Sequence, residues 1–524
     1  MRTRFALLLL VVLVVACEGE KSVPPPTRHA PVPPPPGLVA EMVVVRPGPL
    51  LGELREATGV SALVMPRTLG GLVANFFGLP IRVAEHVEDE KPLTAAAALR
   101  KRELHVAAAA HVKRGFVEQA TRGEDGSFIA ERDGDLTWLK AGPKARRALV
   151  PGTLAVVDDC LVVGTSREAV TLLGPYLART VAPGVKQDAA GTHIDVRAGA
   201  LAKLFEAIEP PKLPAPWSSI ADPKEILAAM RDIARELGAG EVTLDLAKDA
   251  LVMEARFDAA SAEAGRRLAK WPTMPARALL DVPSDTVAAA IWVEDAEARH
   301  QRAKARADAL SELVGDAKDD LRKALEALSR GRGADTRIGL RCTGVGLTGF
   351  ASGSVADKKA IDEGLKTALA LGDHAAVKKL LHEKDLDLES KKTRIERVPI
   401  DVWRLRLKPD DEDETREVID LLGGADESRY LVAAGMETVD TLQRLHEKET
   451  PEKPNEAMRA AVRRLGDKLW FGVLGDPQGL HACLQGKPGG SFTTPVSLGA
   501  APDEKRARLR LHIARPLLRL VSTL

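Results

Sequence analysis

The arrangement of apolar and polar positions in this chain predicts β-hairpins, each followed by an amphipathic helix. Apolar or alternating runs come in pairs, and polar or glycine-containing turns join the two runs of each pair. Such pairing is typical of hairpins. The segment Val242–Phe257 shows it best. Val242, Leu244 and Leu246 share one face of its first strand, and the residues between them are polar.

This hairpin-plus-helix unit recurs along the chain. Four copies are visible at intervals of about 90 residues, the last of them degenerate. We therefore expect an internal duplication in which residues 220–275 superpose on residues 315–372, with two strands and two helices in the same order. Chance similarity is the alternative, because hairpins followed by helices are common and the shared residues are mostly Leu, Val and Ala. The leucines that mark the four copies are Leu161, Leu251, Leu347 and Leu431.

Single strands and longer helices complete the predicted elements. Asp222-Pro223-Lys224-Glu225 has the composition of a helix start, with an N-cap acid and proline at the first helical position. Gly238 would end that helix. The charged stretch 295–328 carries leucines at helical spacing. The single strands are predicted at Ser61–Met65, His193–Val196, Thr286–Val293, Lys468–Leu474 and Leu509–Ile513.

These elements predict an α+β fold. Hairpins impose antiparallel pairing, so we expect antiparallel sheets with helices packed on one face, repeated along the chain. Hydrophobic residues make up 45% and charged residues 28% of the 524 residues, the balance of a globular protein with a sizeable core. We expect a first α+β half over residues 51–275 and a second over residues 276–524.

The N-terminus has the features of an export signal. Arg2 and Arg4 precede an apolar run, Phe5–Val15, of eleven residues. That run is too short to span a hydrocarbon core of about 30 Å but has the length of a signal-peptide core. It ends at Val14-Val15-Ala16-Cys17, which resembles the bacterial lipobox. The alternative is an ordinary secretory peptide with a coincidental cysteine.

The lipobox resemblance implies a bacterial lipoprotein. Residues 1–16 would be removed, and Cys17 would carry a diacylglycerol on its thiol and an acyl chain on its amine. Glu18 follows the cysteine, where the sorting pattern of this class favours the outer membrane over the inner one. The membrane is thus the first expected partner, through the lipid at Cys17.

A proline-rich linker is predicted after the anchor, over residues 17–50. Eight of the thirteen residues from Pro24 to Pro36 are proline. Such a segment is extended, at about 3.1 Å per residue, and would hold a folded body away from a lipid surface. No other segment approaches 18 consecutive apolar residues, so no transmembrane helix is predicted.

Charge and aromatic content exclude some classes of function. Lys+Arg total 75 and Asp+Glu total 74, for a net charge of +1. A nucleic-acid binder would need a strong basic excess. Aromatic residues are only 3% of the chain, too few for stacking platforms. We therefore expect no nucleic-acid partner.

Three cysteines remain if Cys17 is lipidated. An odd number in an oxidising compartment allows at most one internal disulfide. The alternative is that all three are small buried apolar residues. They are Cys160, Cys342 and Cys483.

The familiar catalytic and metal-binding motifs are absent. There is no G-x-S-x-G, G-x-x-x-x-G-K-[ST], H-E-x-x-H or C-x-x-C in the sequence. The pairs His105/His111 and His374/His382 are too widely spaced for i, i+3 or i, i+4 ligands on one helix face. We expect no catalytic residue, no cofactor and no metal, and hence no enzyme.

Other suggestive residues have simpler interpretations. The acidic run 410–414 fails the calcium-loop template, because Arg416 and Leu422 stand where Gly and Glu are needed. Asp158-Asp159-Cys160 fits a hairpin turn. His193 and His512 each precede isoleucine and would be equivalent positions in two copies. Four tryptophans in strand-like segments are interpreted as core residues, with a ligand cavity as the alternative: Trp138, Trp292, Trp403 and Trp470.

The body resembles, in its patterning alone, large bacterial envelope lipoproteins built from duplicated α+β units, a group of unknown function. We therefore expect a lipid-anchored envelope protein with a non-catalytic binding or scaffolding role. The rival from another class is a carrier or chaperone for lipids or other apolar envelope molecules. A carrier needs an apolar cavity between sheet and helices, whereas a scaffold needs an exposed apolar or charged patch.

Overall fold

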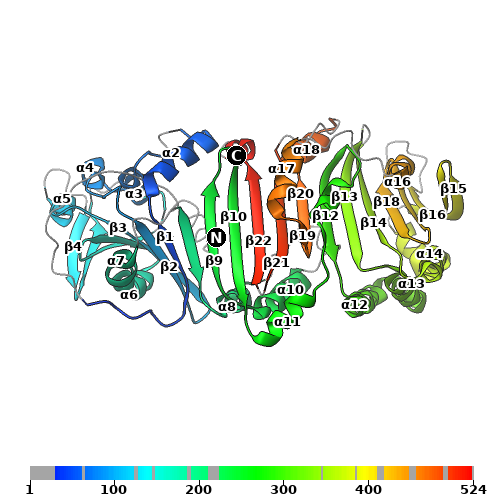
Figure 1. The fold of residues 1–524 in the computed structure, drawn as a ribbon, viewed down its shortest axis with the longest axis horizontal. Helices are drawn as coiled ribbons and strands as arrows, with labels where there is room; N and C mark the ends of the chain where they lie inside the picture. Colours follow the sequence, from blue (N-terminus) through cyan, green and yellow to red (C-terminus); the bar gives the residue numbers. More distant parts are fainter. Residues whose placement is uncertain are drawn as a thin grey trace. The chain divides into compact units, whose positions relative to one another are not determined.

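The computed structural model describes most of the chain from residue 30 to residue 521, and the described residues form two compact units (Figure 1). Unit 1 comprises Met1–Leu268, Asp503–Arg508 and Leu518–Leu524, and unit 2 comprises Ala269–Pro502 and Leu509–Leu517. The described ranges are 30–61, 65–122, 128–143, 148–150, 152–185, 191–209, 223–343, 346–383, 386–409, 418–447, 456–487, 494–504 and 506–521.

One antiparallel sheet forms the centre of unit 1, in the order β4-β5-β6-β7-β3-β2-β1-β8-β9-β10. β1 lies between β2 and β8, so the folded body begins at residue 38 and the prediction of a linker as far as residue 50 is wrong. The strands are β1 (Leu38–Val44), β2 (Leu93–Arg100), β3 (Glu103–His111), β4 (Phe128–Asp133), β5 (Leu136–Ala141), β6 (Thr153–Val157), β7 (Cys160–Gly164), β8 (Thr192–Val196), β9 (Leu237–Leu246) and β10 (Ala250–Ala259).

The hairpin predicted at Val242–Phe257 is confirmed. Leu246 pairs with Leu251 across the turn, and exposure alternates along β9 with a period of two. The helix before it begins at Pro223, as predicted, but it gives way to β9 at Leu237. Gly238 therefore lies inside a strand rather than ending the helix.

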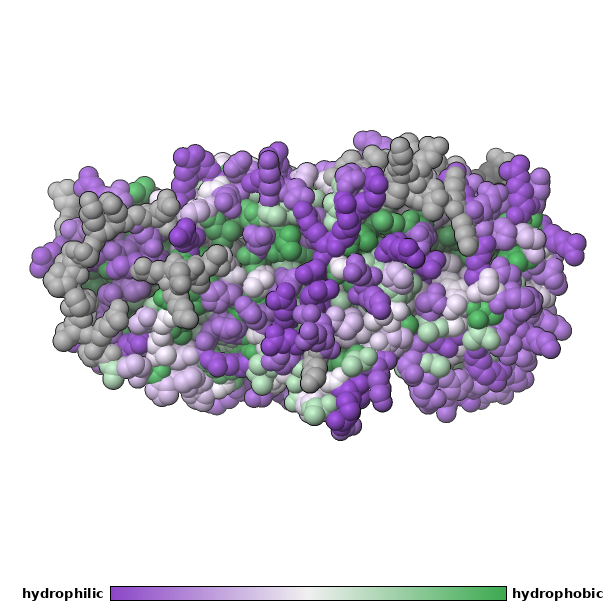
Figure 2. All heavy atoms as spheres, in the orientation of Figure 1, coloured by the Kyte–Doolittle hydropathy of each residue, from purple (hydrophilic) through white to green (hydrophobic). Residues whose placement is uncertain are grey.

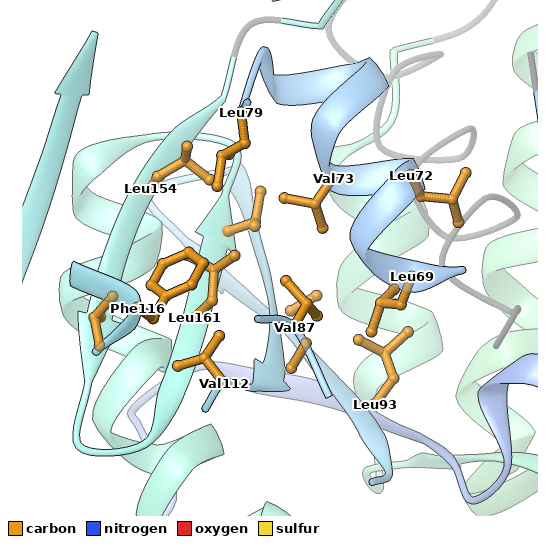
Figure 3. Close-up of a cluster of buried hydrophobic side chains, with 14 of the residues drawn as sticks. Leu69, Leu72, Val73, Leu79, Val87, Leu93, Val112, Phe116, Leu154 and Leu161 are labelled. Carbon is orange, nitrogen blue, oxygen red and sulfur yellow. The ribbon is translucent and has the colours of Figure 1, made fainter. Parts of the chain in front are cut away.

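Helices cover both faces of this sheet. Ala95 and Ala108 pack on one side with residues of α2–α5, and Ala96 and Ala107 pack on the other with α6 and η1. The predicted α+β class with antiparallel sheets is confirmed, but helices lie on both faces rather than one, because strands that are apolar on both faces need cover on both. Figure 3 shows the first interior, with Leu69 of α3 beside Leu93 of β2. The helices are α2 (Pro47–Thr58), α3 (Leu69–Phe77), α4 (Ile81–Ala84), α5 (Phe116–Thr121), α6 (Arg167–Tyr176), the π-helix η1 (Leu177–Val181), α7 (Ala182–Gly184), α8 (Ala200–Ala207), α10 (Pro223–Glu236) and α11 (Ala262–Lys270).

The strands of unit 2 are also paired antiparallel, in the order β15-β16-β17-β18-β14-β13-β12-β20-β21. A small second sheet pairs β11 with β19. The strands are β11 (Met274–Pro275), β12 (Thr286–Val293), β13 (Asp335–Thr343), β14 (Gly346–Ser354), β15 (Leu386–Ile395), β16 (Val398–Pro409), β17 (Ile419–Ala425), β18 (Arg429–Gly435), β19 (Lys468–Leu469), β20 (Phe471–Gly475), β21 (Val496–Asp503) and β22 (Arg506–Ala514).

Helices of unit 2 also lie on both faces of their sheet. Leu431 of β18 packs with Leu442 of α16, while the next residue, Val432, packs with Ile361 of α14. The helix predicted over residues 295–328 is divided at Gly315, whose φ is +53°. The helices are η2 (Ala276–Leu280), α12 (Ala296–Val314), η3 (Gly315–Ala317), α13 (Lys318–Gly331), α14 (Lys358–Ala370), η4 (Leu371–Asp373), α15 (Ala375–His382), α16 (Thr438–Glu447), α17 (Glu456–Leu465), α18 (Pro477–Leu484) and α19 (Arg515–Val521).

The strands of the two units have the same spatial order: strands that come at corresponding places in the chain also lie at corresponding places in the sheet. β4-β5-β6-β7-β3-β2-β1-β8-β9 of unit 1 matches β15-β16-β17-β18-β14-β13-β12-β20-β21 of unit 2, strand for strand. The duplication is thus of a whole unit. The prediction of four equivalent hairpins is wrong, because β9–β10 corresponds to β21–β22, whereas β13–β14 corresponds to β2–β3. Only the first and fourth predicted copies, β6–β7–α6 and β17–β18–α16, occupy equivalent places.

Candidate functional site

One face of the unit 2 sheet is apolar from strand to strand. Directly paired residues of antiparallel strands lie on the same face, so the register defines rows across the sheet. Two such rows, given in the next two sentences, form one face of the sheet. We name this face the open face. One row is Leu498, Val473, Ala290, Ile338, Ala351, Val432, Gly423 and Trp403. The next row is Val496, Gly475, Ala288, Leu340, Gly349, Ala434, Leu421 and Leu405.

The open face remains accessible to solvent along its central strands. On β13, Ile338 and Leu340 are 40% and 37% exposed, while their neighbours Gly339 and Arg341 are buried. Leu421 on β17 is 38% exposed. An exposed sheet face ordinarily carries polar side chains, so a face of this composition marks an interaction surface. Figure 2 shows apolar residues, in green, reaching the surface among hydrophilic ones on the side drawn.

The corresponding face of unit 1 is covered by helices. The matching row there runs through Met42, Ala95, Ala108 and Val163. These residues share an interior with leucines and valines from the helices that connect β1 to β2 (Figure 3). The covering residues are Leu51 of α2, Leu69, Leu72 and Val73 of α3, Leu79, and Val83 of α4.

The equivalent connection in unit 2 takes a different course. α12 and α13 connect β12 to β13. Leu328 of α13 packs with Ile361 of α14 against the far end of β17 and β18, beside Ala425 and Tyr430. Ile338 and Leu340 in the middle of the sheet stay half-exposed. The open face is therefore covered in unit 1, whereas in unit 2 α14 packs on it at Val432 and the central strand β13 stays accessible.

A buried charge network supports the opposite face of the same strands. Arg341 of β13 is 1% exposed and donates hydrogen bonds to Asp285, Asp440 and Thr441. Burial raises the pKa of Asp440, but hydrogen bonds from Arg341 and Arg444 outweigh it and hold that pKa below its ordinary value. The network ties α16 to the strands and keeps the charge of Arg341 away from the open face.

A disulfide joins Cys342 of β13 to Cys483 of α18, with the Cα atoms 5.7 Å apart. Sequence reasoning left the pairing undecided between one disulfide and none. The bond fixes α18 beside Leu347 and Val287, at one end of the sheet. Cys160, in unit 1, is a buried free cysteine.

The predicted tryptophans divide between core and open face. Trp138 and Trp470 are buried, as expected, with Arg167 above the ring of Trp138 and Trp271 edge-on to Trp470. Trp292 of β12 and Trp403 of β16 are half-buried, and both of these strands contribute residues to the open face.

The histidines are arranged differently from the sequence-based expectation. His193 lies on β8 and His512 on β22, which are not equivalent strands of the two units, so the predicted equivalence is wrong. His512 is buried and contacts Arg464. His374 contacts Asp320 at 3.2 Å, with no cysteine or serine in the contact. His111 instead approaches Asp159 and Cys160, a convergence that sequence spacing did not reveal.

Part of the proline-rich segment, Val32–Pro36, contacts the folded part of unit 1. Thr180 of η1 donates a hydrogen bond to the Val32 carbonyl and accepts one from the Val32 amide. Pro33–Pro36 line a hollow of about 690 Å³ together with Arg100 and with Arg167 and Leu172 of α6. Most of the surface that lines this hollow is apolar, and Arg100, Arg167 and Glu168 supply charged groups at it.

Several sequence predictions lie wholly or partly outside the described residues. The predicted lipidation site Cys17 and signal peptide precede residue 30, and the acidic run 410–414 falls in a gap. Most of the strand predicted at Ser61–Met65 and the helix N-cap predicted at Asp222 also fall in gaps. Within the described residues, no helix is long and apolar enough to cross a membrane.

Comparisons with known proteins leave the function open. No protein-family model and no curated protein matches the chain. The solved structure of crystal form I of TP0453 aligns at 9% identity over 44% of this chain and 77% of its own, with a TM-score of 0.22. Crystal form III aligns at 9% identity over 43% of this chain and 80% of its own, with a TM-score of 0.24. Similarity at this level does not transfer a function.

Proposed function

We propose that this chain is a lipid-anchored protein of the bacterial cell envelope that binds an amphipathic helix of a partner protein on the open face, without catalysis. The lipid at Cys17 holds it to a membrane, with the outer membrane favoured by Glu18. The open face supplies the binding surface. The observation that carries the proposal is the exposure of Ile338 and Leu340 within two fully apolar rows.

The helix as occupant is supported by the duplication. In unit 1 the same face is covered by α3, which presents Leu69, Leu72 and Val73 at helical spacing. A partner helix with that spacing would find the equivalent surface on unit 2. Small residues beside Ile338 and Leu340, among them Ala290 and Gly349, leave room for a helix to approach the sheet closely. Complete burial of a half-exposed Ile or Leu would contribute roughly 1 kcal/mol each.

Binding a partner fits the open face better than carrying lipid. A carrier shields its cargo inside a cavity, whereas an exposed apolar patch is the property of an interaction surface. The hollow beside Pro33–Pro36 belongs to unit 1 and is lined partly by the charged residues Arg100, Arg167 and Glu168. Lipid carriage is the second candidate, and the experiment below distinguishes it.

The test is site-specific photocrosslinking in intact cells. A photoreactive amino acid replaces Ile338, or, as a matched control, Ile129, an isoleucine on strand β4 of unit 1 that is 57% exposed. We expect adducts at position 338 whose cross-linked peptides map to an apolar helix face of another protein, and none at position 129. Lipid adducts at 338 would replace the proposal by the carrier function, and adducts equal at both positions would overturn both.

Charge substitution completes the test. Ile338→Lys and Leu340→Lys should abolish the adduct formed by a photoreactive amino acid at another open-face position, Leu421, because burying an unpaired ammonium is costly. Ile129→Lys should leave that adduct unchanged. The binding of an environment-sensitive apolar dye to the purified protein should fall in the first two variants and stay unchanged in the third.

A further inference from the structure

Three potential metal-binding side chains converge at one edge of the unit 1 sheet. His111 is the last residue of β3, and Cys160 is the first residue of β7. These two residues are paired directly with each other in the antiparallel ladder, so their side chains lie on the same face. Asp159 belongs to the β6–β7 turn. His111 Nδ1 lies 3.2 Å from Asp159 Oδ2 and 3.7 Å from Cys160 Sγ.

The backbone holds this cluster in place. The amide of Val112 donates a 2.8 Å hydrogen bond to the carbonyl of Asp159, which fixes the turn against the end of β3. Asp158 has a φ of +53°, and its carboxylate is bound by Arg179. The two adjacent acids therefore have different partners, with Asp158 bound by Arg179 and Asp159 close to His111.

The distances match those around a tetrahedral zinc ion. With Zn–S near 2.3 Å and Zn–N and Zn–O near 2.0–2.1 Å, the ligand atoms of a tetrahedral site lie about 3.3–3.6 Å apart. The other carboxylate oxygen of Asp159, Oδ1, lies 3.7 Å from Cys160 Sγ, and one ligand atom from each of the three residues lies within 4.8 Å of the other two. Thiolate, imidazole and carboxylate are the donor types that Zn²⁺ takes in proteins.

Access to the cluster is from the solvent side. Cys160 is fully buried, but the side chains of His111 and Asp159 are 13% and 39% exposed. A metal ion could therefore bind between them and keep a water as its fourth ligand. Lys91, the nearby cation, is paired with Glu88 at 2.6 Å.

The cluster does not have the geometry of a catalytic triad. A triad uses the two different ring nitrogens of histidine for the nucleophile and the carboxylate. Here one atom, Nδ1, faces both groups. Burial, together with the Asp159 carboxylate, raises the pKa of Cys160 well above its ordinary value, which keeps the group a thiol at neutral pH.

Unit 2 shows that packing alone does not require these residues. The position equivalent to the His111–Cys160 pair is occupied by Ser354 and Arg429, which are paired across β14 and β18. Arg429 forms an ion pair with Asp426 there. The same junction is thus built without histidine or cysteine, so the cluster in unit 1 is an addition to the fold.

The geometry points to a zinc site formed by His111 Nδ1, Asp159 and Cys160 Sγ, with water as the fourth ligand. On binding, Zn²⁺ replaces the thiol proton of Cys160 and any proton on Nδ1, and both are released to solvent. The site is independent of the open face and of its partner.

The test is metal titration of the purified full-length protein after treatment with a chelator. Co²⁺ serves as the probe, because a thiolate ligand gives it a charge-transfer band in the near ultraviolet. We expect one equivalent of Co²⁺ to produce that band and Zn²⁺ to displace it. Absence of the band from folded wild-type protein would overturn the proposal, whatever the variants do.

Matched variants assign the ligands. Cys160→Ser should remove the band, and Asp159→Asn should weaken Co²⁺ binding at least about 100-fold, since even outer-shell changes cost 10–100-fold. Asp158→Asn, in the same turn and with the same charge change, should bind within about 2-fold of wild type, because Asn tolerates a positive φ. A band that persists in Cys160→Ser, or equal losses in the two aspartate variants, would contradict the assignment.

Discussion

The disulfide between Cys342 and Cys483 should be a major contributor to the stability of unit 2. Its two residues are 141 positions apart in the chain. In the chain-entropy account, closing a loop of this length lowers the entropy of the unfolded state by an amount worth about 5 kcal/mol. Measured losses are commonly smaller, so we expect the double variant Cys342→Ala/Cys483→Ala to lose about 3–5 kcal/mol of unfolding free energy.

Urea denaturation followed by tryptophan fluorescence measures this loss. Four tryptophans lie in unit 2, so the signal reports mainly on that unit: Trp271, Trp292, Trp403 and Trp470. The melting temperature should fall by roughly 6–20 °C. Wild-type protein in reductant is the internal control and should approach the stability of the double variant.

Two results would refute this reasoning. The first is a double variant within about 1 kcal/mol of wild type, which would mean that the unfolded chain gains little freedom from the loss of the bond. The second is the absence of the linked peptide pair containing Cys342 and Cys483 from a non-reduced digest.

Three further predictions concern the anchor, the core and the charge network. Cys17→Ser should block lipidation and cause the uncut precursor to accumulate, which a membrane-fraction immunoblot would show; normal processing would exclude the lipoprotein assignment. Leu173→Ala, at a fully buried position of α6, should cost about 2–5 kcal/mol in urea denaturation, and Leu172→Ala, at the half-buried neighbour, clearly less. Because the pKa of Asp440 is lowered in the folded protein, its contribution to stability is present above its ordinary value of about 3.8 and is lost as the pH falls through the folded value. Asp440→Asn should therefore flatten the acid limb of the stability–pH curve for unit 2; an unchanged limb would show that other carboxylates dominate.

Local sequence patterns predicted several of the individual elements correctly. Alternation in Val242–Phe257 predicts a hairpin, and that hairpin forms with the expected turn. The strand at Thr286–Val293 was also found from its apolar run. Both succeed because hairpin pairing and strand burial depend on residues that are near one another in the chain.

The strand order could not be predicted in the same way. β13–β14 is central in its sheet, whereas β9–β10 lies at the end of the strand order of unit 1, although the sequence pattern predicts both as copies of one hairpin. Pairing of β3 with β7, or of β14 with β18, joins residues far apart in the chain, and no local pattern encodes such a partner. The repeat was therefore detected but assigned the wrong length.

The predicted export signal and the predicted lipid anchor at Cys17 each rest on contiguous residues, and so does the predicted mixture of helices and strands, which the structure confirms. The tertiary structure alone decided what those strands expose. Ile338 and Leu340 belong to a strand that the sequence predicts, and the course of α12 and α13 leaves their side chains partly exposed. The structure likewise brought His111 to Asp159 and Cys160, 48 and 49 positions away, because β3 pairs with β7. Sites built by long-range pairing exist only once the sheet has formed, which is why spacing rules for a single helix or loop did not find them.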